Sequence, residues 1–178
     1  MGSSSKKIQE INISCYYDDN QLYASYQLKT GIEFHNSGGY IMKMPEDNID
    51  TIMFAPCGMN CKVCYKHCYQ KKPCAGCLND DIGKPEHCQK CKIKNCVKEK
   101  GLSYCYECTD YPCKQIKYLE KSYKTRYKAS LIDNSKFVRQ HGLEKFMENQ
   151  KELYTCPKCG GIISLHDREC SECQEKMN

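Results

Sequence analysis

Cysteine is the residue that most constrains how this chain can fold, because 17 of its 178 residues are cysteines and most of them recur in closely spaced groups. A chain so rich in cysteine is held together either by disulfides or by metal ions. The sequence from Met1 onward lacks the apolar run of a secretory signal peptide, and no stretch has the length and apolarity of a membrane span. We therefore expect a cytoplasmic protein with no membrane contact, whose cysteines bind metal in a reducing compartment.

The small number of large apolar residues also favours metal binding as a source of stability. The chain has no tryptophan and only 4 phenylalanines, whereas tyrosine occurs 14 times. Tyrosine buries its ring but requires a partner for its hydroxyl. A chain with so few large apolar side chains needs disulfide cross-links or bound metal ions to be stable, and metal binding then supplies folding free energy.

The cysteine spacing divides the chain into four predicted units. Residues 1–50 contain one cysteine, Cys15, and form a β-rich N-terminal segment. Residues 51–113 contain twelve cysteines and form a multi-metal domain. Residues 114–154 contain none and are helical, and residues 155–178 form a zinc ribbon. The predicted fold class is a small α+β, metal-stabilised protein with an irregular cysteine-rich centre, short helices and a β-type zinc ribbon.

Within the first unit, two extended runs are predicted. The isoleucines at positions 8, 11 and 13 lead into Tyr16 and Tyr17, residues 18–20 suggest a turn, and Leu22 to Leu28 suggests a second strand. We expect Cys15 to be a buried free thiol on the first strand. Pro45 to Asp50 is interpreted as a linker.

The third unit contains helical patterns. Apolar residues recur three or four positions apart, which predicts a helix with one apolar face; they are Ile116, Leu119, Tyr123 and Tyr127. Asn134 or Ser135 is predicted to cap a second helix that stops at Gly142. A third helix is predicted around Leu143, Phe146, Met147 and Leu153.

The ribbon has the most specific motif in the chain. Cys156-Pro-Lys-Cys159 is followed, after ten residues, by Cys170-Ser-Glu-Cys173. Each C-x2-C knuckle turns tightly, so that four thiolates converge at about 2.3 Å from one tetrahedral Zn²⁺. Glycine after the second cysteine allows backbone amides to face sulfur. His166 lies in the loop of the ribbon, but we expect it to remain outside a site that four cysteines already saturate.

The centre has twelve cysteines, enough for three further sites of four thiolates each. The sequence does not show which cysteines share an ion. The twelve candidate ligands are Cys57, Cys61, Cys64, Cys68, Cys74, Cys77, Cys88, Cys91, Cys96, Cys105, Cys108 and Cys113. The last six form two copies of C-x2-C-x4-C. His67 and His87 adjoin cysteines and are lesser candidates to replace one of them.

Three kinds of central site compete. The C-x2-C knuckles favour structural zinc. Cys57 to Cys68 is C-x3-C-x2-C-x3-C, which approaches a ferredoxin motif but lacks the proline that would follow it. Cys57, Cys61 and Cys64 also match the radical S-adenosylmethionine spacing, followed by Tyr65, but too little chain follows for the barrel that such enzymes require.

These motifs resemble an uncharacterised cysteine-rich prokaryotic family, the domain of unknown function 3795. The resemblance begins with Ala55-Pro-Cys57-Gly-Met-Asn-Cys61-Lys-Val-Cys64 and continues through the spacing that ends at Cys113. The tail, from Gly142-Leu-Glu-Lys-Phe146 into the ribbon, resembles longer members. The resemblance implies metal binding but no reaction, and Cys68 departs from the family pattern.

The predicted function is a metal-binding protein with several all-cysteine zinc sites, acting as an interaction or regulatory module. The alternative is an iron–sulfur protein for electron transfer or redox sensing, with zinc only in the ribbon. No paired-carboxylate, Ser-His-Asp or His-Glu arrangement supports an enzyme. The expected partner is another protein. Lysines along one side of the helix predicted after Cys113 make a nucleic acid a lesser candidate partner. The formal charge of +5 is weak support for it, because thiolates that bind metal would make the net charge more negative.

Overall fold

The structure is a computed structural model that describes residues 12–18, 21–28, 32–34, 40–68 and 73–177. For residues 12–40 within these ranges only the backbone is described. The expectations for the isoleucines at positions 8 and 11, and for the middle of the first turn, lie outside the described residues, as does the side chain of Cys15.

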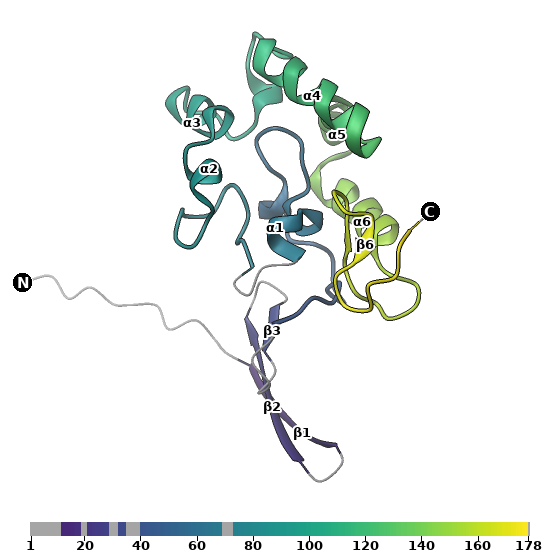
Figure 1. Ribbon diagram of the computed structural model, residues 1–178. Helices are drawn as coiled ribbons and strands as arrows, with labels where there is room; N and C mark the ends of the chain where they lie inside the picture. The colour runs from purple at the N-terminus through teal and green to yellow at the C-terminus, as the bar shows by residue number, and fades with distance from the viewer. Residues whose placement is uncertain (1–11, 19–20, 29–31, 35–39, 69–72, 178) are drawn as a thin grey trace, which may run out of the picture.

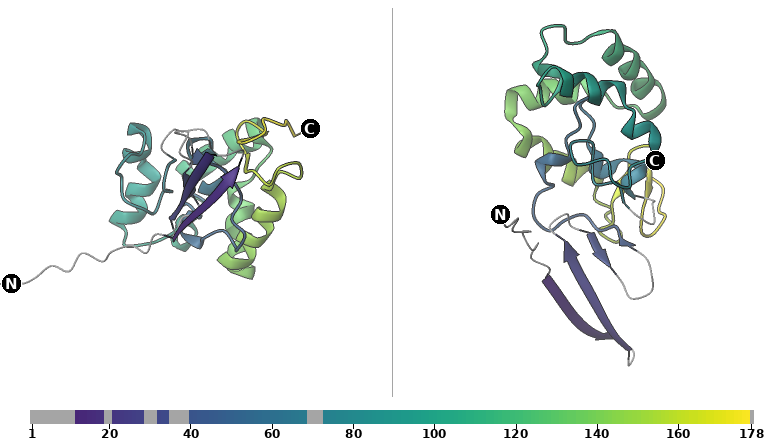
Figure 2. Two further views of the ribbon diagram at one scale, coloured as in Figure 1. Left: turned by 90° about the horizontal axis from the view of Figure 1, so that it is seen from below. Right: turned by 90° about the vertical axis from the view of Figure 1, so that its left-hand side faces the viewer.

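The N-terminal segment is an antiparallel sheet with the strand order β1-β2-β3-β4. Its strands are β1 (Asn12–Asp18), β2 (Gln21–Leu28), β3 (Ile32–Phe34) and β4 (Tyr40–Ile41). Asp18 pairs with Gln21, so a two-residue connection joins the first two strands. The two predicted extended runs are confirmed, and the β1–β2 hairpin points away from the helices (Figures 1 and 2).

The centre consists of short elements, as its cysteine density predicts. They are the 3-10 helices η1 (Thr51–Met53), η2 (Cys61–Val63) and η3 (Cys105–Glu107) and the α-helices α1 (Tyr65–Cys68), α2 (Glu86–Gln89) and α3 (Lys92–Glu99). Asn60 caps η2 by accepting a hydrogen bond from the backbone N–H of Lys62 at 3.0 Å. Cysteines sit at the ends of several of these elements, so that turns bring thiols together.

Three longer helices follow the centre: α4 (Lys114–Tyr127), α5 (Leu131–His141) and α6 (Leu143–Tyr154). α4 has the predicted apolar face, and its Ile116 is buried. Gly142, with φ 87°, ends α5 as predicted. None of the helices in the described part of the chain combines the length and the apolar character required of a membrane-spanning segment.

The predicted cap of α5 is wrong. The helix begins at Leu131, and Ser130 is its N-cap, because the Ser130 hydroxyl accepts a hydrogen bond from the backbone N–H of Asp133 at 3.0 Å. Asn134 and Ser135 lie inside the helix instead. Asn134 donates to the Gly58 carbonyl at 2.9 Å, which ties α5 to the cysteine-rich centre.

The C-terminal ribbon contains β5 (Ile163–Ser164) and β6 (Glu169–Cys170). Residues 42–44 lie antiparallel to its first arm, because the Met44 N–H donates to the Gly160 carbonyl at 2.9 Å and the Ile162 N–H donates to the Met42 carbonyl at 2.9 Å. The ribbon is therefore bound to a segment more than a hundred residues earlier in the chain.

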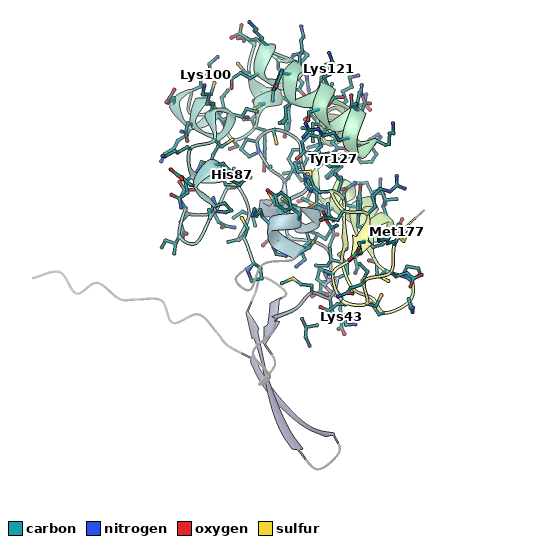
Figure 3. All side chains as sticks on the ribbon, viewed as in Figure 1. Lys43, His87, Lys100, Lys121, Tyr127 and Met177 are labelled. Carbon is teal, nitrogen blue, oxygen red and sulfur yellow. The ribbon has the colours of Figure 1, made fainter. Side chains whose placement is uncertain are left out.

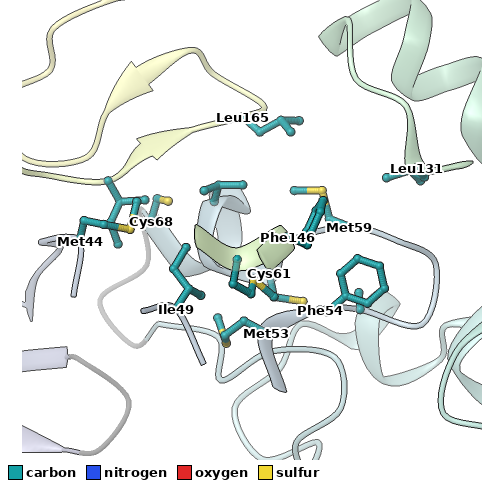
Figure 4. Close-up of a cluster of buried hydrophobic side chains, with 14 of the residues drawn as sticks. Met44, Ile49, Met53, Phe54, Met59, Cys61, Cys68, Leu131, Phe146 and Leu165 are labelled. Atoms are coloured by element: carbon teal, nitrogen blue, oxygen red, sulfur yellow. The ribbon is translucent and has the colours of Figure 1, made fainter. Parts of the chain in front are cut away.

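One hydrophobic core joins the centre, α5, α6 and the ribbon (Figure 4). Phe54 lies within it, fully buried, with its ring edge-on to Tyr104 at 5.4 Å and to Phe146 at 5.2 Å. Ile162 and Leu165 are the residues of the ribbon that belong to this core. Five methionines fill the remaining space, which suits an irregular core because methionine adapts its shape; they are Met42, Met44, Met53, Met59 and Met147.

The predicted linker, Pro45 to Asp50, packs against the hydrophobic core and α6. Ile49 is 2% exposed, and the Asn48 amide donates to the Glu144 carbonyl on α6 at 3.0 Å. Lys151 donates to the carbonyl groups of Glu46 and Asp47. The division of the chain into four units stays a prediction.

A buried carboxylate joins α4 to α5. Glu120 is 6% exposed and accepts hydrogen bonds from the Ser130 hydroxyl at 2.6 Å and from the backbone N–H groups of Leu131 at 2.8 Å and Ile132 at 3.1 Å. Lys124 adds an ion pair at 3.0 Å. Burial alone would raise the pKa of the Glu120 carboxyl, but these hydrogen bonds outweigh it, so the pKa lies below its usual range.

We expect Glu120→Gln to lower the free energy of unfolding by about 1–3 kcal/mol, because the amide cannot satisfy all of these donors. For a chain of this size the melting temperature falls by roughly 3–10 °C. The carboxylate's contribution is present above its unfolded-state pKa of about 4.3 and is lost as the pH falls through the lower folded value, so the two proteins converge in acid. Thermal melts at several pH values measure this difference.

Glu148→Gln is the matched control, because the Glu148 carboxylate is 50% exposed and pairs only with Lys145 on the surface. Exposed ion pairs contribute little, so its melting temperature should change by about 1–2 °C at most. Equal melting temperatures for both variants would show that Glu120 does not anchor α5.

Candidate metal centre

The ribbon brings its four cysteines into one tetrahedral group. The Cys156 and Cys173 sulfurs lie 3.6 Å apart, and the Cys159 and Cys170 sulfurs also lie 3.6 Å apart. All four sulfurs are within 4.8 Å of one another. Four thiolates at about 2.3 Å from one ion would be separated by about 3.8 Å, the edge of the tetrahedron. The group can therefore hold a single metal ion.

Two glycines allow this geometry. Gly160 has φ 70°, and the Gly161 N–H donates to the Cys159 sulfur at 3.4 Å, as the motif predicts. A Cβ on Gly161 would lie 2.7 Å from the Cys170 sulfur. Burial raises the pKa of the Cys156 thiol, but the surrounding backbone N–H and thiol groups outweigh burial and lower that pKa to about 7, which favours the metal-binding thiolate.

His166 links the ribbon to α4, outside the coordinating group. Its Nε2 lies 3.1 Å from the Tyr123 hydroxyl, and its Nδ1 accepts a hydrogen bond from the Tyr65 N–H at 3.4 Å. The ring also packs edge-on to Tyr127 at 4.6 Å. The pKa of His166 is lowered, mainly by burial. We interpret this histidine as a contact between the ribbon and the helices.

Seven further central thiols interact electrostatically with one another, and we call them the seven-thiol group: Cys57, Cys61, Cys64, Cys74, Cys77, Cys88 and Cys91. Cys57 and Cys91 also interact with Cys105, which lies outside this group. The Cys77 N–H donates to the Cys61 sulfur at 3.3 Å, and the two thiols also interact directly. Burial raises the pKa of Cys88, and the charges of Cys77, Cys74 and Cys91 raise it further, which indicates that these four lie close together.

The pKa of several thiols in the seven-thiol group is raised. Burial raises the pKa of Cys57 and of Cys64, and nearby thiols, Cys77 among them, add to both shifts. Without a bound cation these two thiols are protonated at neutral pH. A metal bound by them would displace their protons and would therefore bind more tightly as the pH rises.

Two lysines bring positive charge to this group. Lys84 is 5% exposed and donates to the carbonyls of Cys77 at 3.2 Å and Asn79 at 2.7 Å. It also pairs with Asp81 at 3.2 Å, and Lys94 pairs with the same carboxylate at 2.5 Å. A hydrogen bond with the Cys61 thiol lowers the pKa of Cys77 to about 7, against the effect of burial, and the charges of both lysines add to this shift. No sequence pattern singles out Lys84, because a lysine between turn residues is ordinarily exposed.

A third group of four thiols surrounds a cavity of about 250 Å³ and is called the four-thiol cavity. Its cysteines are Cys96, Cys105, Cys108 and Cys113. Burial raises the pKa of Cys105, and the charges of Cys113, Cys96 and Cys108 add to the shift, so that these thiols lie near one another. Among the described residues, only the ribbon cysteines meet the spacing for one ion.

Cys68 lies in the hydrophobic core, where burial and the charge of Cys64 raise its pKa. It is 4% exposed within the core, and its thiol faces the Lys62 carbonyl at 3.6 Å. Burial lowers the pKa of the neighbouring Lys62 amine to about 8. Its predicted role as a ligand stays a prediction, and the structure gives it the surroundings of a core thiol (Figure 4).

The two histidines named as lesser ligands differ in burial. His87 is exposed on α2 (Figure 3). His67 is 2% exposed, and its Nδ1 lies 2.8 Å from the Cys74 carbonyl, so Nδ1 carries the proton. Its Nε2 has no hydrogen-bond partner among the described residues. Burial lowers the pKa of His67 to about 4, which keeps the ring neutral.

These features define a cysteine-rich α+β chain with a four-cysteine site able to hold a metal ion. Residues 53–118 match the model of the family described as "Protein of unknown function (DUF3795)", so this part of the chain is similar to that family. The match includes all twelve central cysteines and confirms the resemblance there. It ends before Gly142, so the resemblance of the tail stays a prediction. Neither the curated proteins nor the solved structures gave a match.

We expect Gly161→Ala to weaken metal binding by the ribbon about tenfold or more, because the added methyl group displaces the Cys170 sulfur. Competition between the protein and a coloured chelator for added Zn²⁺ measures the affinity. Gly160→Ala is the matched control. It strains the backbone at φ 70° by about 1 kcal/mol, but its methyl group meets nothing within 4 Å. If Gly160→Ala weakens binding as much as Gly161→Ala, contact with Cys170 is not the cause.

Proposed function

We propose that this is a multi-site metal-binding protein whose ribbon holds one structural zinc ion through Cys156, Cys159, Cys170 and Cys173. The observation that carries the proposal is the pair of 3.6 Å sulfur separations, which agrees with the tetrahedron expected around zinc. Ile162 and Leu165 connect this site to the hydrophobic core, so zinc binding in the ribbon would contribute to the stability of the whole fold.

We propose zinc in the seven-thiol group as well. Cys74-x2-Cys77 and Cys88-x2-Cys91 supply two C-x2-C pairs, the ligand arrangement of the ribbon. The positive charges of Lys84 and Lys94 would offset the net negative charge of a zinc ion bound by four thiolates. In this proposal zinc organises a centre whose elements are too short to be stable alone.

The biological role that fits these sites is an interaction or regulatory module rather than an enzyme. A saturated four-thiolate zinc site has no open position for a substrate. The surface supports a protein partner, because Ile82 and Tyr118 are 76% and 81% exposed. Tyr118 shares α4 with exposed lysines, which keeps a nucleic acid as a lesser candidate. All sixteen cysteines with described side chains are free thiols, which suits a reducing compartment such as the cytoplasm.

The second candidate is an iron–sulfur protein for electron transfer or redox sensing, with zinc only in the ribbon. It is favoured by one observation: among the described central thiols, no group of three or more meets the single-ion spacing of the ribbon. Four thiolates that bind four different irons stand further apart than four that share one ion.

Metal analysis of protein purified without oxygen, with a visible spectrum, tests the proposal. We expect more than one zinc ion per chain, and we expect Cys173→Ala to lose about one of them. Exactly one zinc together with iron and acid-labile sulfide would favour the second candidate, and a protein without zinc would contradict the proposal.

Cys15→Ala is the control, because Cys15 is the cysteine that belongs to none of the predicted sites. Its metal content should equal that of the unaltered protein. Loss of zinc from this variant would show that the proposed ligand sets are incomplete.

A further inference from the structure

The four-thiol cavity is built from the ends of separate elements. Cys96 comes from α3, Cys105 and Cys108 lie at the two ends of the η3 turn, and Cys113 is the N-cap of α4. Val97, Leu102 and Tyr111 complete a mainly apolar wall. Four soft ligands in an apolar cavity provide the chemistry of a metal–sulfur site.

The size of the cavity distinguishes it from the ribbon. A tetrahedral ion bound by four thiolates fills the space between them, with sulfurs about 3.8 Å apart. Here the cysteines line a cavity of about 250 Å³ that is open to solvent on one side, and, unlike the ribbon sulfurs, they do not all lie within 4.8 Å of one another. A group larger than one ion is needed to contact all four thiols at once.

An amine donor and a helix end lie beside two of the sulfurs in the cavity. The Lys100 amine donates to the Cys108 sulfur at 3.2 Å and to the Asp110 carboxylate at 3.2 Å, and this carboxylate lies 3.9 Å from the same sulfur. Cys113 makes no side-chain cap hydrogen bond, so its sulfur is available at the N-terminus of the 14-residue helix α4. Both sulfurs are therefore placed to serve as ligands of a metal–sulfur group.

We propose that the four-thiol cavity binds one [4Fe–4S] cluster, with Cys96, Cys105, Cys108 and Cys113 each bound to one iron. The inference rests on the proposed metal-binding function and adds a second kind of site to it. Assembly takes two ferrous ions, two ferric ions and four sulfide ions from solution. Each thiol releases its proton to solvent and forms one bond to iron, so no electron is transferred. The seven-thiol group is a poorer place for the cluster, because its Cys61 and Cys77 thiols already touch.

Anaerobic reconstitution of the full chain with equal amounts of ferrous and ferric iron and with sulfide tests the proposal. We expect a brown protein with visible charge-transfer absorption and about four iron and four sulfide per chain. Cys108→Ala should lose this colour and most of the iron. Cys15→Ala, which changes a cysteine outside all of the proposed sites, should keep both. Zinc content and helical circular dichroism, measured on the same samples, show whether Cys108→Ala is folded.

Three outcomes would overturn the proposal: a colourless reconstituted protein, about two irons per chain, or colour that survives in Cys108→Ala. Each differs from failure of the proposed zinc function, which would appear as a protein without zinc, whether or not iron is bound.

Lys100→Met provides a test that keeps all four ligands. We expect the variant to bind the cluster but with a lower reduction potential, because an N–H donor to a ligating sulfur stabilises the reduced, more negative cluster. Voltammetry of both proteins measures the difference. Lys136→Met, which removes a surface amine paired with Asp133, is the control and should leave the potential unchanged. Equal potentials in all three proteins would place the cluster away from Lys100 and overturn the assignment.

Discussion

Burial of many thiols close to one another is the physical constraint on which the centre depends. Burial, with a smaller contribution from neighbouring thiols, raises the pKa of Cys57, Cys64, Cys88 and Cys105, so these four thiols stay protonated at neutral pH unless a cation is bound. Protonated thiols are weak ligands and weak hydrogen-bond partners, and they add little to the stability of short elements such as α2 and η3. Metal ions bound as proposed would convert these thiols into ligands and so stabilise the centre.

The hydrophobic core includes only part of the cysteine-rich centre. Phe54, Phe146 and the buried methionines join the first part of the centre, α5, α6 and the ribbon. By contrast, the two copies of C-x2-C-x4-C lie largely outside this core, and Val97 is the buried apolar residue of α3. Six of the twelve central cysteines therefore lie where apolar packing is thin, whereas Cys57, Cys61, Cys64, Cys68 and Cys77 lie in or against the core.

The sequence predicted those features whose signal is local. Period-3.6 spacing placed α4, Gly142 marked the end of α5, and two C-x2-C knuckles at fixed separation located the ribbon site. The start of α5 was missed because Lys128 and Ser130 reverse the chain earlier than the candidate caps suggested; Lys128 adopts the left-handed conformation, with φ 56°. Contacts across the chain have no local signal. The pairing of residues 42–44 with the ribbon and the buried amine of Lys84 therefore could not be predicted.

The central thiols show why motif counting cannot assign ligands. Twelve cysteines divide evenly into three sets of four, but their electrostatic interactions cross these sets, because Cys105 interacts with Cys91 and Cys57 as well as with Cys96, Cys108 and Cys113. Cys96 belongs by sequence to the motif of Cys88 and Cys91, yet α3 carries it to the cavity shared with Cys105, Cys108 and Cys113. One turn of chain decides this, because Cys91 caps the N-terminus of α3 whereas Cys96 lies in its second turn. Under the proposed assignments the two ends of one motif serve two sites, so metal bound in either site would fix an end of α3 and stabilise the other site through the helix between them.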